Sequence, residues 1–179
     1  MPSKSKAGAL QVMDETGIFS VVCRHGIVQF LLDMVQSGEL AKYPLASAEK
    51  LIHTFGKGIL FAYNIGCTFS ATLSKLPIGD LVKEANFRCC TSSFHGAAHH
   101  RACQLDFLIS LQKGAGIEDG EGNEWVYSES NALAAIIHHA SPYYRHLRIH
   151  IHFSKWDETK YEKLGEPPYL EYALWVQLH

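Results

Sequence analysis

Three potential metal ligands recur every four residues in the stretch FHGAAHHRACQ (94–104), namely His95, His99 and Cys103. Imidazole nitrogens and thiolate sulfurs are the ligands that structural zinc prefers. A helix rises about 1.5 Å per residue, so His95 and Cys103 would stand about 12 Å apart on one straight helix. That is too far for one ion, whose bonds are about 2.0–2.3 Å long. A shared ion therefore requires the helix to begin after His95, and Gly96 is a residue at which the chain can break.

A closed zinc site also needs a fourth ligand. Cys67, Cys89 or Cys90 could supply it, but only through the fold. Spacing alone favours a simpler interpretation, in which a packed helix satisfies its polar groups with backbone partners. A nucleophilic cysteine, either Cys103 or Cys67, is a further alternative, although no local signature marks either thiol.

Acidic residues gather in the glycine-rich segment 113–124, at Glu118, Asp119, Glu121 and Glu124. Carboxylate oxygens are hard ligands that suit Mg²⁺. Their spacing is not that of an EF-hand, and a solvated acidic loop is the more common explanation of such a run.

Basic and aromatic residues are interleaved in YYRHLRIHIHFSKW (143–156), which contains Arg145, Arg148 and Lys155. Such mixtures can contact phosphates and stack on bases. An amphipathic surface helix would give the same pattern, and the sequence does not separate the two.

The elements that must position these residues alternate between strands and helices. Apolar, β-branched runs predict strands at 18–23, 59–67 and 86–94. Helical spacing and end signals predict helices at 26–43, 47–56, 68–76, 97–111, 130–141 and 143–164. This alternation predicts an α/β fold around a small sheet.

Composition limits the possible functions. The chain has 179 residues, enough for one domain, with 47% hydrophobic and 19% charged residues. Its net charge of −2 means that DNA binding would need a local basic patch. We expect no membrane span and no signal peptide, because the chain lacks an apolar run of about 18 residues. Five cysteines without C-x-x-C spacing favour reduced thiols in an intracellular protein.

Five segments, in this order, resemble the Kyakuja-Dileera-Zisupton (KDZ) transposases of fungal genomes. They are DETGIFSVVCRHG (14–26), LAKYPLA (40–46), YNIGC (63–67), FHGAAHHRACQ (94–104) and SESNALAA (128–135). The resemblance divides the chain into a flexible lead (1–15), a partial transposase core (16–164) and a divergent tail (165–179).

The resemblance implies an RNase H-like fragment with a small mixed sheet flanked by helices. In that fold, two strand-borne aspartates and a later glutamate hold two Mg²⁺ ions, which cleave phosphodiesters and transfer DNA strands. It further implies DNA as the partner, a nuclear location, no membrane and no small-molecule substrate. It also favours structural Zn²⁺ at His95, His99 and Cys103 as a brace beside the core.

Two departures from the family pattern predict an inactive copy. The first catalytic aspartate is expected before the DETGIF motif, in sequence that this chain does not contain. Asn64 stands where the family usually has aspartate, and it offers one neutral carbonyl oxygen in place of a carboxylate. The late glutamate matches Glu124 or, less closely, Glu118. The alternative is a domesticated, non-catalytic module, braced by metal, that contacts nucleic acid or protein.

Overall fold

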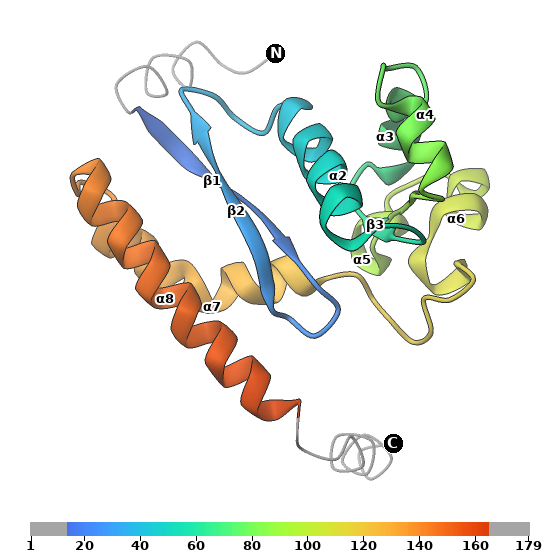
Figure 1. Ribbon diagram of the computed structural model, residues 1–179. Helices are drawn as coiled ribbons and strands as arrows, with labels where there is room; N and C mark the ends of the chain where they lie inside the picture. The colour runs from blue at the N-terminus through green and yellow to red at the C-terminus, as the bar shows by residue number, and fades with distance from the viewer. Residues whose placement is uncertain (1–13, 165–179) are drawn as a thin grey trace, which may run out of the picture. The chain divides into compact units, whose positions relative to one another are not determined.

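The computed structural model describes residues 14–164 (Figure 1). The expected tail 165–179, and all but the last two residues of the expected lead 1–15, lie outside them. The strands are β1 (Glu15–Val22), β2 (Val28–Val35), β3 (Leu60–Ala62) and β4 (Arg88–Cys90). The helices are α2 (Lys42–Phe55), α3 (Gly66–Leu73), α4 (Gly79–Glu84), α5 (Ser93–Ala97), α6 (Arg101–Phe107), the 3₁₀ helix η1 (Ile109–Leu111), α7 (Gly122–Ile137) and α8 (Pro142–Lys163).

This mixed α/β composition confirms the predicted class, but the expected single sheet is divided. Strands β1 and β2 form one two-stranded sheet, and β3 and β4 form another. The described chain falls into two compact units, the first comprising 14–21 and 31–122 and the second 22–30 and 123–164.

The predicted helix at 26–43 is wrong, because residues 28–35 form strand β2 and helix α2 begins only at Lys42. A tight turn causes this, because the Gly26 N–H donates to the Cys23 carbonyl at 2.9 Å and Gly26 adopts φ +78°. That positive φ favours glycine, and the turn returns the chain along β1 as a hairpin. Apolar residues line β2 without strict alternation because both of its faces are half-buried.

The first unit is built around the parallel pair β3–β4, in which Phe61 is opposite Cys89 and Ala62 opposite Cys90. Helix α3 begins directly against β4, since a Cβ on Gly66 would lie 2.1 Å from the Cys90 carbonyl oxygen. Because the strands are parallel, their carboxyl ends lie at the same edge, where α/β proteins commonly bind ligands.

Three predicted helices have different ends in the structure. Helix α2 begins before 47 and holds Pro44 in its first turn, where the missing N–H costs no hydrogen bond. Helix α7 begins at Gly122 rather than at 130. The predicted helix 97–111 is replaced by α6 and η1, and residues 98–100 separate α6 from the short helix α5, which ends at Ala97.

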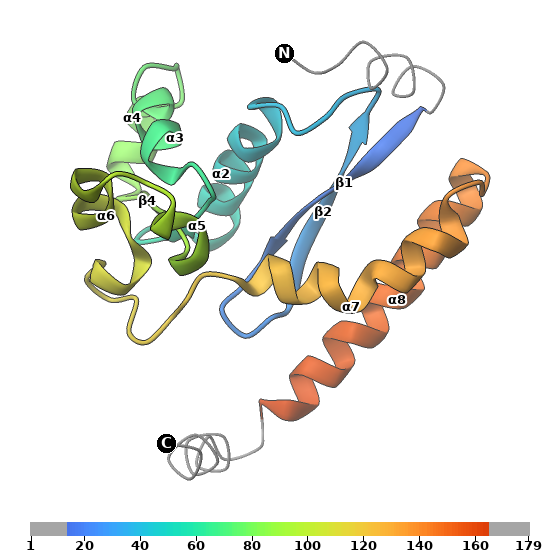
Figure 2. The same ribbon diagram turned by 180° about the vertical axis from the view of Figure 1, so that it is seen from behind.

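In the second unit α7 and α8 cross at an angle, as both views show (Figures 1 and 2). Ser130 Oγ lies 2.9 Å from His152 Nε2 across the pair. The indole N–H of Trp156 donates to the Gly26 carbonyl at 2.7 Å, which fastens the hairpin tip to α8. None of the helices within 14–164 is long and apolar enough to cross a membrane.

Candidate functional site

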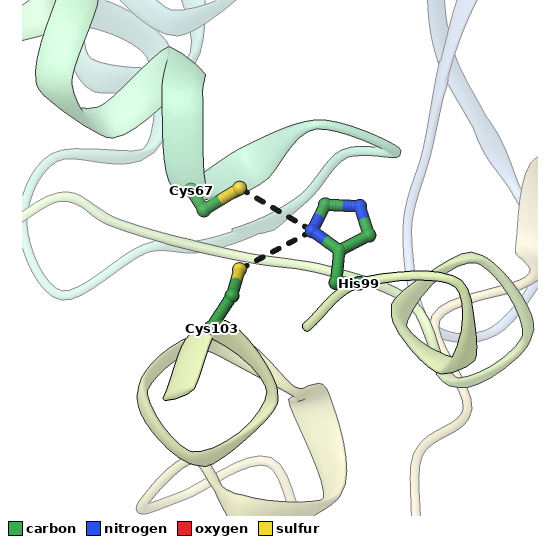
Figure 3. Close-up of side chains that lie close together, drawn as sticks. All are labelled: Cys67, His99 and Cys103. Atoms are coloured by element: carbon green, nitrogen blue, oxygen red, sulfur yellow. Dashed lines mark hydrogen bonds between the residues drawn. The ribbon is translucent and has the colours of Figure 1, made fainter. Parts of the chain in front are cut away.

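Cys67, His99 and Cys103 converge in the first unit (Figure 3). The Nδ1 atom of His99 lies 3.4 Å from Cys67 Sγ and 3.2 Å from Cys103 Sγ. All three potential ligand atoms lie within 4.8 Å of one another. Cys103 is buried and the other two side chains are half-buried, so the cluster is largely shielded from water.

This geometry fits a tetrahedral soft metal ion. Zinc bonds of about 2.05 Å to nitrogen and 2.3 Å to sulfur place ligand atoms about 3.6–3.8 Å apart. The observed separations of 3.2 and 3.4 Å between sulfur and nitrogen differ from that spacing by only a few tenths of an ångström. Two sulfurs and one imidazole favour zinc over magnesium, which prefers oxygen ligands.

Local structure explains how the three residues meet. Cys67 is the second residue of α3 and Cys103 lies in α6, and these two helices pack against each other. His99 lies in the link between α5 and α6, outside both helices. The link is possible because His100 caps α6, its Nδ1 accepting the Cys103 N–H at 3.3 Å.

The side chain of Gln104 fixes this link. Its Nε2 lies within hydrogen-bond distance of three backbone carbonyls, at 2.8 Å from His99, 3.2 Å from Ala97 and 3.2 Å from Gly96. Of these carbonyls, that of Gly96 also accepts the His99 N–H at 3.0 Å. Gln104 therefore holds the backbone that carries His99, and it is a positioning residue for any bound metal.

His95 lies elsewhere than the predicted ligand set requires. Its Nδ1 is 3.1 Å from Ser92 Oγ and 3.6 Å from Glu121 Oε2. The structure brings His99 and Cys103 together with Cys67, one of the three cysteines considered for the fourth position. Sequence spacing could not identify Cys67 because it is more than thirty positions from His99 along the chain.

The remaining cysteine candidates lie in the β-sheet core. Cys90 packs with Ile109 and Ala115. Burial raises the pKa of Cys89 to about 12 and that of Cys90 to about 11, so both remain thiols at neutral pH. Burial, followed by the neighbouring Cys67, also raises the pKa of Cys103 to about 11. Metal binding would therefore have to displace a proton from Cys103.

A second group of residues lies at the carboxyl edge of β3 and β4. Asn64 is exposed in the turn just after β3. Gly120 packs over the same edge, since a Cβ there would lie 3.2 Å from the Ala62 Cβ and 3.3 Å from the Ser92 Cα. Gly120 has φ +74°, so a side chain would meet backbone strain as well as close contacts.

The crossing at Gly120 brings Glu121 to this edge. Its Oε1 accepts the Phe94 N–H at 2.8 Å, and its side chain is only 12% exposed. Of the two candidates singled out from the sequence, Glu124 lies in the first turn of α7 with a carboxylate oxygen within 4.8 Å of ligand atoms of Glu121 and His95, and Glu118 is a half-buried loop residue. Glu121 is one of four acidic residues in the segment 113–124, and their spacing does not distinguish it from the other three. Its glycine neighbours are the signal of a tight crossing.

An amide at position 64 is a weaker ligand for a pair of catalytic Mg²⁺ ions than a carboxylate would be. Each ion needs several anionic oxygens, and the two ions stand about 3.5–4 Å apart. At this edge the Glu121 carboxylate accepts the Phe94 N–H, the Asp119 carboxylate accepts the Glu121 N–H at 2.9 Å, and the neutral amide of Asn64 follows β3.

Comparison with known proteins bears on the origin of this arrangement. No curated protein and no solved structure matches the chain. The family model described as Kyakuja-Dileera-Zisupton transposase matches residues 1–157, most of the sequence. The match includes both the Cys67–His99–Cys103 cluster and the strand edge that carries Asn64. The chain therefore belongs to the KDZ transposase family.

Proposed function

We propose that this chain is a transposase-derived, RNase H-like core that no longer cleaves DNA. The observation that carries the proposal is Asn64 in the turn just after β3, at the edge where the resemblance requires an aspartate. An amide carbonyl is a neutral ligand, and the amide nitrogen would direct its hydrogens at a cation. A site that needs two divalent ions is weakened by the loss of that charge.

Cleavage of labelled duplex DNA in Mg²⁺ or Mn²⁺ tests the loss of activity. We expect no cleavage or strand transfer above that of a Glu121→Gln variant, which removes a carboxylate at the strand edge. Metal-dependent cleavage by the native chain that disappears in Glu121→Gln would overturn the proposal.

The second candidate is a non-catalytic binding module held together by Zn²⁺. The Cys67–His99–Cys103 cluster favours it, because the three side chains tie α3, the α5–α6 link and α6 together without the strand-edge site. Zinc bound there would cross-link these elements through three side chains, and a water molecule or another group would have to fill its fourth position. Elemental analysis of the purified chain should give close to one zinc per molecule, and a metal-free native protein would remove this candidate.

DNA remains the partner that family membership supports, and a nuclear location follows from that role. A tagged chain expressed in a eukaryotic cell should concentrate with chromatin. Exclusion from the nucleus would contradict this part of the proposal.

A further inference from the structure

Helix α8 carries a mixed aromatic and basic stripe on its exposed side. Tyr144, Arg148, Ile151 and Lys155 follow one another at intervals of four, three and four residues, which places them on one face. Tyr144 is 38% exposed and Ile151 52% exposed. The opposite face holds the buried residues of the helix, Ile149 and Phe153.

Charge is segregated along the same helix. Residues 142–156 contain three Arg or Lys residues and no Asp or Glu, in a chain whose net charge is −2. The first acid after them, Asp157, is directed to the hairpin, where its Oδ1 accepts the Val28 N–H at 2.8 Å. Lys155 is 78% exposed, and its contact to Glu158 at 3.5 Å is a surface pair of little energetic weight.

Aromatic rings accompany this charge in a defined geometry. The Arg148 guanidinium carbon lies 4.8 Å from the centre of the Tyr144 ring, and its Nε donates to the Tyr144 hydroxyl at 2.7 Å. A second bond from Nη2 to the same hydroxyl holds the guanidinium in place. The adjacent Tyr143 ring is 77% exposed. An ordered cation beside exposed rings is an arrangement that can bind both a phosphate and a base.

We infer that this stripe, together with the neighbouring Tyr143, binds single-stranded DNA. The inference rests on the proposed function, in which the chain derives from a DNA-acting enzyme. Unpaired bases offer open faces for the tyrosine rings, whereas a duplex offers the stripe only its phosphates. Arg148 and Lys155 are about 10 Å apart along the helix and can therefore contact separate phosphates of one strand.

Fluorescence anisotropy with labelled oligothymidine and the full chain tests the inference. The double variant Arg148→Ala/Lys155→Ala should bind more weakly, and its logarithmic salt slope should fall by about 1.4, which is ~0.7 for each lost phosphate contact. Tyr143→Ala should weaken binding about tenfold, as expected for one lost base stack, while the salt slope stays unchanged.

Two controls make the test specific. Lys75→Ala/Lys83→Ala removes two exposed charges from the first unit and should leave binding unchanged. A duplex of equal length should bind less tightly and should not respond to Tyr143→Ala. Circular dichroism should match the native chain for every variant, because the replaced side chains lie at the surface.

The inference is overturned if the stripe variants bind oligothymidine like the native chain, if Tyr143→Ala weakens duplex binding equally, or if the native chain binds no single strand. None of these results affects the cleavage assay, which decides the proposed function separately.

Discussion

At the scale of single residues, the exchange of a carboxylate for an amide that we propose at Asn64 would change charge with almost no change in size. The side chain is exposed in a turn, so aspartate would fit there without repacking. The position therefore affects the affinity of the strand edge for cations, and not its fold. Glu121, anchored by the Phe94 N–H, is the nearby carboxylate that an added charge would join.

Asn64→Asp should increase the affinity for Mn²⁺ several-fold, because a carboxylate is added at the edge that already carries Glu121. Titration calorimetry measures the change. Asn131→Asp, which adds the same charge to the exposed side of α7, is the matched control and should have no effect. An equal increase in Mn²⁺ affinity in both variants would mean that only the net charge of the chain matters.

The identity of the zinc ligands is a second question at this scale. Cys67→Ser and His99→Ala should each lower Co²⁺ affinity by at least about tenfold, and Cys67→Ser should also weaken the sulfur-to-cobalt charge-transfer band. His95→Ala should retain the Co²⁺ affinity and the charge-transfer band, because the Nδ1 atom of His95 faces Ser92 and Glu121. Loss of the band in His95→Ala would instead support the ligand set expected from spacing.

At the scale of elements, the link between α5 and α6 determines whether His99 can reach the cysteines. A continuous helix would have carried His99 away from Cys67, which comes from a different helix. The break costs the hydrogen bonds of an uninterrupted helix, and the side chains of His100 and Gln104 replace several of them. This local exchange is the structural basis of the cluster.

Gln104→Ala should therefore lower zinc affinity by about 10–100-fold, the range found when a group that orients a ligand is removed. Gln112→Ala is a close control, because Gln112 Nε2 also donates to two backbone carbonyls, those of Asp106 and Leu108, without supporting His99. Both variants should lose similar stability in the metal-free form. Equal zinc affinities in the two variants would show that Gln104 does not position His99.

At the scale of the whole molecule, metal binding should stabilise the first unit in proportion to its occupancy. Zinc at 100 times its Kd should add about 2.7 kcal/mol to the free energy of unfolding, if unfolded chains do not bind it. Urea denaturation with zinc and with a chelator measures the difference. Cys67→Ser should unfold identically in both conditions, and a native chain that is indifferent to the chelator would exclude a stabilising site.

Much of the architecture could be predicted from the sequence where the signals are local. Ser141 and Pro142 mark the start of α8, and the apolar run around Phe61 marks β3, although only three of its residues pair. The strand β2 could not be predicted because Val28, Leu31, Leu32 and Val35 suit a helix equally well, and pairing with β1 decides between the two. The RNase H-like fold remains a proposal.

Only part of the candidate site could be predicted from the sequence. His99 and Cys103 are visible as a pair because a helix-like spacing connects them. Cys67 and Glu121 cannot be identified from spacing. Packing of α3 against α6 brings Cys67 to the cluster, and the positive φ of Gly120 brings Glu121 to the strand edge. Long-range packing and backbone geometry leave no signature in residue spacing.

The hydrogen bond from Trp156 to the Gly26 carbonyl has a consequence for biosynthesis. Its two partners are 130 residues apart, so the hairpin tip leaves the ribosome long before the helix that will hold it. At about 5–20 residues per second the tip would wait on the order of ten seconds for its indole partner. The contact between the hairpin tip and α8 can therefore form only after α8 has been synthesised, and a nascent chain stalled within α7 should expose the tip to protease.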